Sequence, residues 1–492
     1  MMLNANAQRA SPPNPKLTPR VNLPRLATLL LLSLAVAAPA AEFKAGAAAV
    51  NITPPLGTVI NGGFRPIFAE NVHDELHARA LALTDGKTTL AFVVVDNCVI
   101  PREVFDAAKA ILTNEVALPP ANVMMSSTHS HSCGSVQEAY LTPASEPYRA
   151  QLPRYIADAV RRAMHNFAPA RVAWGIGNLP QHVFCRRWRL NEGAKAPNPF
   201  GGNDLVKMNP GIANPDLAEP AGPTDPEIAF LAVQHADGTP LALLANYSLH
   251  YVGGVGPGDL SADYFGAFAD RIQQLLGADR QDPPFVGMLS NGTSGDINNI
   301  NWRGPDNRIK GPYAQIRLVA NDAAMEVQRV LKTVPWRDDV TLRVASQELT
   351  LATRKPSPEE VEKAKALLAG RPPLALKTPA EIYAREQTLL ADYPDTIKMP
   401  LTAFRIGDLA VAGWPNEVFA ESGLAMKRES PVKPLFVISL ANGWFGYLPT
   451  PEQHPLGGYE TWRSRTSYLE VGAEPKIRKA LLEVLGQLAA KP

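Results

Sequence analysis

The sequence predicts a mixed α/β protein, with mixed sheets that contain antiparallel hairpins and are flanked by helices. Short apolar runs alternate with helical patterns along the chain after residue 40. Three pairs of these runs flank Asp-Gly or Gly-Asp turns, which are hairpin signals. The same stretch contains no internal repeat, low-complexity tract or flexible linker. Strands and helices mixed in this way favour one large unit over residues 41–492.

The individual elements follow from these patterns. The expected hairpins pair residues 78–84 with 88–95, 228–234 with 241–247, and 402–406 with 409–413. Apolar runs at 91–95, 285–289 and 435–440 each precede a polar loop. Helical patterns predict helices over residues 102–112, 148–167, 265–276, 313–331 and 474–488.

Residues 355–395 predict an inserted pair of helices. Ser357 and Thr378 each precede a proline at the first helical position and a glutamate at the third. This arrangement satisfies the free backbone N–H groups at a helix start. Gly370 is expected to end the first helix.

Composition excludes several classes of protein. The chain has 492 residues, is 46% hydrophobic and carries 48 Lys+Arg against 47 Asp+Glu. These values exclude a disordered, collagen-like or coiled-coil chain. A net charge of +1 argues against nucleic acid as a partner, because duplex binding needs a concentrated basic surface. The three cysteines, Cys98, Cys133 and Cys185, are too scattered for a disulfide framework.

The first forty residues predict a signal peptide. They carry four basic residues and no acidic one, then an apolar run over residues 26–36, then Ala38-Pro39-Ala40. The run is shorter than the ~20 residues that span a bilayer. We therefore expect cleavage between Ala40 and Ala41, a periplasmic or secreted protein, and no transmembrane anchor after cleavage.

Candidate functional residues follow the ends of predicted strands. His129 and His131 end one apolar run, His250 follows residues 241–247, Glu417 follows 409–413, and Tyr447 follows 435–440. Each has an ordinary explanation when taken alone, such as a hydrogen-bonded histidine or a glutamate in a helical first turn. Loops at the carboxyl ends of strands gather at one rim, where ligands bind. Two histidines, a carboxylate and an open or tyrosine-filled fourth position form the ligand set of a catalytic zinc site.

Asp96 and Asp296 also follow predicted strands. Two interpretations stay open for them: oxygen ligands of a second hard cation, Mg²⁺ or Ca²⁺, or caps of their loops.

Taken in order, a series of motifs resembles the neutral/alkaline non-lysosomal ceramidase family. The motifs are Ala45-Gly46 with Val50-Asn51-Ile52-Thr53-Pro54-Pro55, Thr128-His129-Ser130-His131-Ser132, Asn246-Tyr247-Ser248-Leu249-His250, Ser261-Ala262-Asp263-Tyr264, Asn291-Gly292-Thr293-Ser294-Gly295-Asp296, Pro415-Asn416-Glu417 and Gly446-Tyr447. The match runs from about residue 44 to residue 465.

The resemblance implies roles for individual residues. His129, His250, Glu417 and Tyr447 would bind zinc. His131 would be a nearby acid/base or oxyanion-stabilising group, and Tyr459 would line the reaction centre. Arg187 would polarise the substrate, although the pair Arg186-Arg187 leaves the register open.

Two features depart from the family pattern. Asn298 stands where family members have a serine, and an amide cannot attack a carbonyl but can donate a hydrogen bond to an oxyanion. Because Pro492 follows soon after Tyr459, we also expect this chain to lack the carboxy-terminal accessory β-domain that the resemblance would imply.

The expected function is therefore an exported, zinc-dependent hydrolase that cleaves the amide (N-acyl) bond of a small-molecule or lipid-like substrate through a metal-activated water. Residues 41–492 would form its single catalytic domain. Two alternatives remain: the same site acting on a non-lipid substrate such as a sugar derivative, and a non-catalytic binding protein with a structural metal. Ser126 and Ser127 lack the context of a serine-hydrolase nucleophile.

Overall fold

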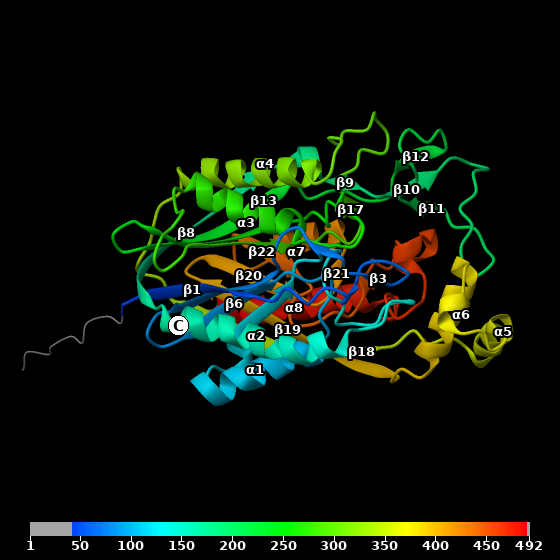
Figure 1. Ribbon diagram of the computed structural model, residues 1–492, viewed down its shortest axis with the longest axis horizontal. Coiled ribbons are helices and arrows are strands. Elements are labelled where there is room, and N and C mark those ends of the chain that lie inside the picture. Colours follow the sequence, from blue (N-terminus) through cyan, green and yellow to red (C-terminus); the bar gives the residue numbers. More distant parts are fainter. Residues whose placement is uncertain (1–41, 490–492) are drawn as a thin grey trace, which may run out of the picture. The chain divides into compact units, whose positions relative to one another are not determined.

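Two β-sheets carry the longer strands of the computed structural model, which describes residues 42–489 (Figure 1). The predicted signal peptide lies outside the described residues. The larger sheet has the strand order β16-β14-β13-β8-β1-β5-β6-β7. Its strands are β1 (Lys44–Asn51), β5 (His77–Thr84), β6 (Thr89–Val95), β7 (Val123–Ser127), β8 (Ala168–Asn178), β13 (Glu227–His235), β14 (Pro240–Tyr247) and β16 (Val286–Asn291). The smaller sheet, in the order β18-β19-β20-β22, contains β18 (Leu342–Ala352), β19 (Thr396–Ile406), β20 (Leu409–Trp414) and β22 (Leu435–Ser439).

The mixed α/β prediction is confirmed, and so are the three hairpins. Strands β5 and β6, β13 and β14, and β19 and β20 pair antiparallel around the expected turns. Strands β6 and β7, β14 and β16, and β20 and β22 instead pair in parallel. Because parallel strands end at the same edge of a sheet, the loops after each of these pairs lie together.

The two sheets pack face to face, and helices cover their outer faces. Phe92 and Met288 of the larger sheet share one buried cluster with Phe404, Val411 and Phe436 of the smaller sheet. Helices α1 (Arg102–Val116) and α2 (Glu146–His165) cover one half of the larger sheet, and α3 (Asp263–Leu275) and α4 (Ala314–Leu331) cover the other half. Helix α8 (Ala473–Ala489) packs on the outer face of the smaller sheet, and α7 (Ala420–Glu429) lies beside it. Full burial of each large apolar side chain stabilises the fold by about 1.5–3 kcal/mol.

A helical segment connects the two longest strands of the smaller sheet. Strands β18 and β19 pair antiparallel along their whole length, ending at the pair Ala352 and Thr396. The chain between them forms α5 (Pro358–Leu368) and α6 (Pro379–Ala391), which lie away from the sheets in Figure 1. Each helix begins with the expected capping box, at Ser357 and at Thr378. We call residues 353–395 the helical insertion.

Short strands complete the loops around the functional residues. They are β2 (Val59–Ile60), β3 (Ile67–Phe68), β4 (Asn71–Val72), β9 (Phe184–Cys185), β10 (Arg187–Leu190), β11 (Val206–Met208), β12 (Leu217–Pro220), β15 (Asp259–Leu260), β17 (Ile297–Asn298), β21 (Glu417–Val418) and β23 (Tyr447–Leu448). The three cysteines are buried free thiols. Within residues 42–489, no helix combines the length and apolar character needed to cross a bilayer.

Candidate active site

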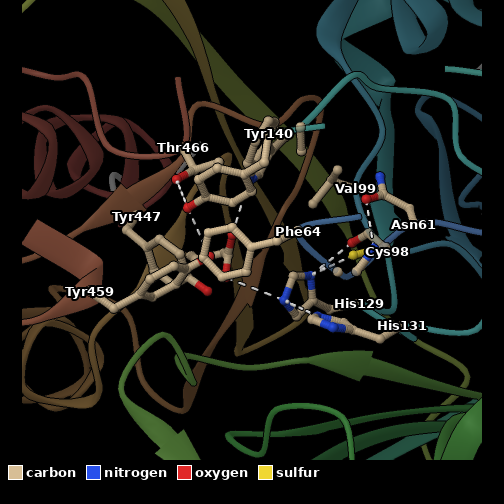
Figure 2. Close-up of a pocket in the computed structure, with 15 residues that line it drawn as sticks. Asn61, Phe64, Cys98, Val99, His129, His131, Tyr140, Tyr447, Tyr459 and Thr466 are labelled. Atoms are coloured by element: carbon tan, nitrogen blue, oxygen red, sulfur yellow. Dashed lines mark hydrogen bonds and ion pairs between the residues drawn. The ribbon is translucent and has the colours of Figure 1, made fainter. Parts of the chain in front are cut away.

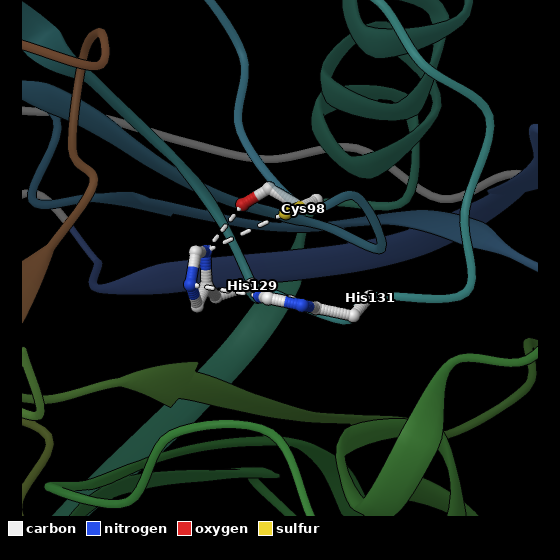
Figure 3. A group of neighbouring side chains, drawn as sticks. All are labelled: Cys98, His129 and His131. Carbon is white, nitrogen blue, oxygen red and sulfur yellow. Dashed lines mark hydrogen bonds between the residues drawn. The ribbon is translucent and has the colours of Figure 1, made fainter. Parts of the chain in front are cut away.

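His129 lies two residues after the end of the edge strand β7, in a backbone conformation that non-glycine residues rarely adopt. Its φ is 74°, and its N–H donates to the carbonyl of Asn97 at 2.9 Å. Such conformations cost roughly 1–3 kcal/mol and cluster at functional sites. The ring Nδ1 lies 2.8 Å from the carbonyl oxygen of Cys98 (Figure 3). Because a carbonyl only accepts, Nδ1 carries a proton, so in the neutral ring the lone pair is on Nε2.

His250 reaches the same point from the other side of the larger sheet. It follows β14, next to the edge strand β16, and the amide of Asn291 at the end of β16 donates to the carbonyl of Thr128 at 3.2 Å. The ends of the two edge strands therefore meet. His250 Nδ1 lies 3.0 Å from the carbonyl of Ser294, which leaves its Nε2 lone pair only 3.0 Å from Nε2 of His129.

Glu417 and Tyr447 are neighbours in a two-stranded parallel ladder. Strand β21 pairs with β23, and these two residues are direct partners in the register. Glu417 Oε2 lies 3.2 Å from Nε2 of His129 and 3.9 Å from Nε2 of His250. Its other oxygen accepts a hydrogen bond from the Trp444 indole at 3.0 Å.

The donor set fits a divalent metal ion. Two imidazole lone pairs and a carboxylate oxygen face one another, and within residues 42–489 no donor makes a well-formed hydrogen bond to Glu417 Oε2. Tetrahedral zinc with ligands at about 2.0–2.2 Å holds its ligand atoms about 3.3 Å apart. The observed separations of 3.0, 3.2 and 3.9 Å surround that value. Backbone carbonyls on both Nδ1 atoms supply the outer contacts that orient metal-binding histidines.

The electrostatics of the cluster also favour a cation. Burial opposes protonation of His129, but Glu417 and Cys98 together outweigh it and raise the pKa of His129 to about 10. Burial raises the pKa of Tyr447, and Glu417 adds to that increase while Arg186 opposes it. The same carboxylate would balance the charge of a bound metal ion.

Cys98 is not positioned to bind the same metal ion as His129, His250 and Glu417. Its sulfur lies 3.9 Å from Nδ1 of His129, on the ring edge opposite Nε2 (Figure 3). Because Nδ1 donates to the Cys98 carbonyl, the thiol and the Nε2 lone pair point to different places.

His131 lies next to His129 but does not belong to the ligand set formed by His129, His250 and Glu417. Its Nε2 lies 3.2 Å from Nε2 of His129, and its ring stacks on Tyr251 with centroids 3.8 Å apart. Gly62 also lies against this side chain, where a Cβ would be 2.6 Å from the imidazole. The stacking on Tyr251 and the close approach of Gly62 together restrict the position of His131.

A cavity of about 70 Å³ opens beside these groups. His129, His131, Glu417, Tyr447 and Tyr459 all line it. Figure 2 shows the aromatic rings and the histidines on opposite sides. Phe64 and Tyr140 also line the cavity, and neither was found from the sequence, since neither follows a predicted strand. The adjacent glycines at residues 62 and 63 are the sequence signal for this region, because glycine lets the backbone approach a neighbouring group closely.

The structure separates the two neighbouring arginines. Arg186 donates to the Tyr447 hydroxyl at 3.2 Å and to the Gly295 carbonyl at 2.8 Å. Arg187 instead donates to the Gly457 carbonyl at 2.8 Å and to Gln453 at 3.2 Å. Of the pair, Arg186 is the one that touches a proposed metal ligand.

Like His250 and Arg187, the predicted residues Asn298, Asp96 and Asp296 do not line the cavity. The amide of Asn298 donates to Asn209 at 2.9 Å. Asp96 forms a buried ion pair with Arg79, and Asp296 accepts from the N–H of Ala420, the first residue of α7. Both aspartates therefore have structural partners, and neither belongs to a metal-binding group within the described part of the chain.

Comparison with known proteins gives structural matches only. No family model and no curated protein sequence matches the chain. The crystal structure of neutral ceramidase from Pseudomonas aeruginosa is similar, with a TM-score of 0.69 and 18% identity over 91% of this chain and 74% of that one. A structure described as ceramidase complexed with C2 gives a TM-score of 0.67 and 16% identity over 91% of this chain and 75% of that one. The chain therefore has a ceramidase-like fold, as the motif series predicted.

Proposed function

We propose that the protein is a zinc-dependent hydrolase that cleaves an amide (N-acyl) bond and acts outside the cytoplasm. One observation carries the proposal: two imidazole lone pairs and a carboxylate oxygen converge beside a cavity. The cavity reaches His129, Glu417 and Tyr447, which suits a catalytic site with an open position better than a closed structural one. The ceramidase-like fold supports the reaction class, and residues 1–40 support export.

His129, His250, Glu417 and Tyr447 would hold the zinc. A zinc ion bound there supplies a Lewis acid that polarises a carbonyl and lowers the pKa of a water to about 7. Arg186, held by Glu460 at 2.9 Å, would place a fixed positive charge beside the Tyr447 oxygen.

The other residues would position the substrate and move its proton. His131 would carry a proton toward the leaving amine, because its ring is held next to His129 and lines the cavity. Tyr459 accepts a hydrogen bond from Tyr140 at 2.9 Å, so its own proton is free to reach a substrate oxygen. Asn298 lines no part of the cavity and its amide is hydrogen-bonded to Asn209, so we assign it no part in the reaction.

The test combines metal analysis with assays of the purified protein on N-acyl lipids, N-acyl amino acids and glycosides. His250→Ala should lose both zinc and turnover. His131→Ala is the matched control, since it should keep zinc and lose about 10²–10⁴ in rate. Full activity in a metal-free preparation would contradict the proposal.

A further inference from the structure

The cavity beside the proposed zinc ligands is small for a lipid. Its volume is about 70 Å³. Since one water needs about 10–15 Å³ of such space, it holds roughly five to seven water-sized groups. Sites for drug-sized ligands are several times larger, at about 300–1,000 Å³. Other cavities in residues 42–489, such as those lined by Met164 and by Asp270, share no wall with it.

The wall opposite the histidines is built from aromatic rings. Phe64 packs on Tyr140 with centroids 4.3 Å apart and on Tyr459 at 6.0 Å (Figure 2). Val99 and Ala139 line the cavity as well. This carbon-rich surface suits the hydrocarbon end of an acyl group better than a polar amine.

Hydrogen bonds hold this wall in place. The Tyr140 hydroxyl lies 2.9 Å from that of Tyr459, 2.8 Å from Thr466 Oγ1 and 3.3 Å from the hydroxyl of Tyr383. One proton and two lone pairs are all that a phenol offers, so these three contacts saturate it. Tyr140 is buried and cannot swing aside without breaking them.

The helical insertion supports the wall from behind. Tyr383 and Arg385 belong to α6, and Arg385 donates to the Tyr140 carbonyl at 2.5 Å. The loop that carries Phe64 is tied to the same segment, because Arg65 donates to the Leu376 carbonyl. A longer acyl chain in the cavity would therefore meet a fixed wall.

We propose that the cavity selects short acyl groups, of about two to four carbons, and that the helical insertion sets this limit. The inference rests on the proposed function and specifies its substrate class: an N-acyl compound with a short acyl chain, whose amine portion lies toward the mouth of the cavity.

The test uses the zinc-loaded full-length protein and amides of one amine with acyl chains from two to sixteen carbons. We expect kcat/KM to be highest at two to four carbons and at least about tenfold lower from eight carbons onward, as for a methylene that a pocket cannot accommodate. Values that rise with chain length would overturn this inference but leave the proposed function intact. Absence of cleavage at every length would overturn both.

A pair of variants tests the wall itself. Phe64→Ala removes a ring that lines the cavity and is 38% exposed, so it should raise the ratio of eight-carbon to two-carbon rates by about tenfold. Phe68→Ala is the control, since this ring is 54% exposed on β3 and lines no part of the cavity. An unchanged ratio in Phe64→Ala, or an equal change in Phe68→Ala, would overturn the assignment.

Discussion

Arg186 and Arg187 form a matched pair for testing the candidate site. Both are buried, and both bind the buried carboxylate of Glu460, at 2.9 and 2.7 Å respectively. Only Arg186 contacts Tyr447. Replacing each arginine in turn by methionine therefore removes the same kind of ion pair, while only one replacement removes a contact to the proposed metal ligands.

The two variants should lose similar stability and different amounts of activity. Each variant leaves Glu460 paired with the other arginine, so each should lose one charge-assisted hydrogen bond to this carboxylate, which is worth about 1.5–3 kcal/mol of stability. The hydrogen bond from Arg186 to the Tyr447 oxygen is charge-assisted, so its loss should cost about 1.5–3 kcal/mol of transition-state stabilisation. We therefore expect kcat/KM to be roughly 10–150-fold lower in Arg186→Met. In Arg187→Met, kcat/KM calculated for the folded protein should change little.

Urea denaturation measures the first quantity, and kcat/KM on an N-acyl substrate, corrected for the folded fraction, measures the second. Arg186→Lys and Arg187→Lys keep the positive charge and serve where the methionine variants fold poorly. Equal losses of kcat/KM in folded Arg186 and Arg187 variants would refute the reasoning, because the two guanidinium groups would then act through Glu460 alone.

Three other changes have defined outcomes. Gly62→Ala places a Cβ 2.6 Å from the His131 ring, at a φ of 108°. The variant should bind as much zinc as the wild type, but its kcat should fall roughly 10²-fold because His131 is displaced. An unchanged kcat would contradict this prediction. Burial lowers the pKa of Lys109 from 10.5 to about 8. Between pH 8 and pH 10.5 the unfolded chain therefore binds this proton and the folded protein does not, so the free energy of unfolding should rise with pH over that range. Lys109→Met should abolish up to about 3 kcal/mol of that rise, measured by denaturation at pH 7.5 and 10.5, and an identical rise in the variant would count against it. Ser357→Ala breaks a capping box and should cost about 1 kcal/mol, seen as faster amide exchange confined to α5.

Short-range sequence patterns predicted the turns and helix starts, because these depend on a few neighbouring residues. The Asp85-Gly86 turn and the two capping boxes use backbone preferences of a few residues, and the structure has them where expected. Strand β8 was missed because glycines at 175 and 177 weaken the strand pattern. A Cβ at Gly175 would lie 2.8 Å from the ring of Phe230, so this glycine is required by packing that a strand pattern does not reveal.

The candidate site was predictable in part for a similar reason. The proposed ligands follow strand ends, which a sequence reveals, and the motif series implied the same residues. The choice between Arg186 and Arg187 was not readable, because adjacent residues near a strand point to opposite sides and either register is allowed. Phe64 and Tyr140 come from loops with no periodicity, and contacts far apart in sequence bring them to the cavity.

The proposed ligands and the cavity wall belong to one hydrogen-bonded framework but come from different kinds of structure. The N–H of Tyr447 donates to the carbonyl of Thr466 at 2.8 Å, and the Thr466 hydroxyl contacts Tyr140. The histidines are fixed by the ends of core strands, whereas Tyr140 is held by Tyr383 of the helical insertion. A change in the insertion would therefore alter the size of the cavity without moving the histidines. Under the proposed function, such a change would alter the substrate length that the cavity accepts and leave the proposed metal ligands in place.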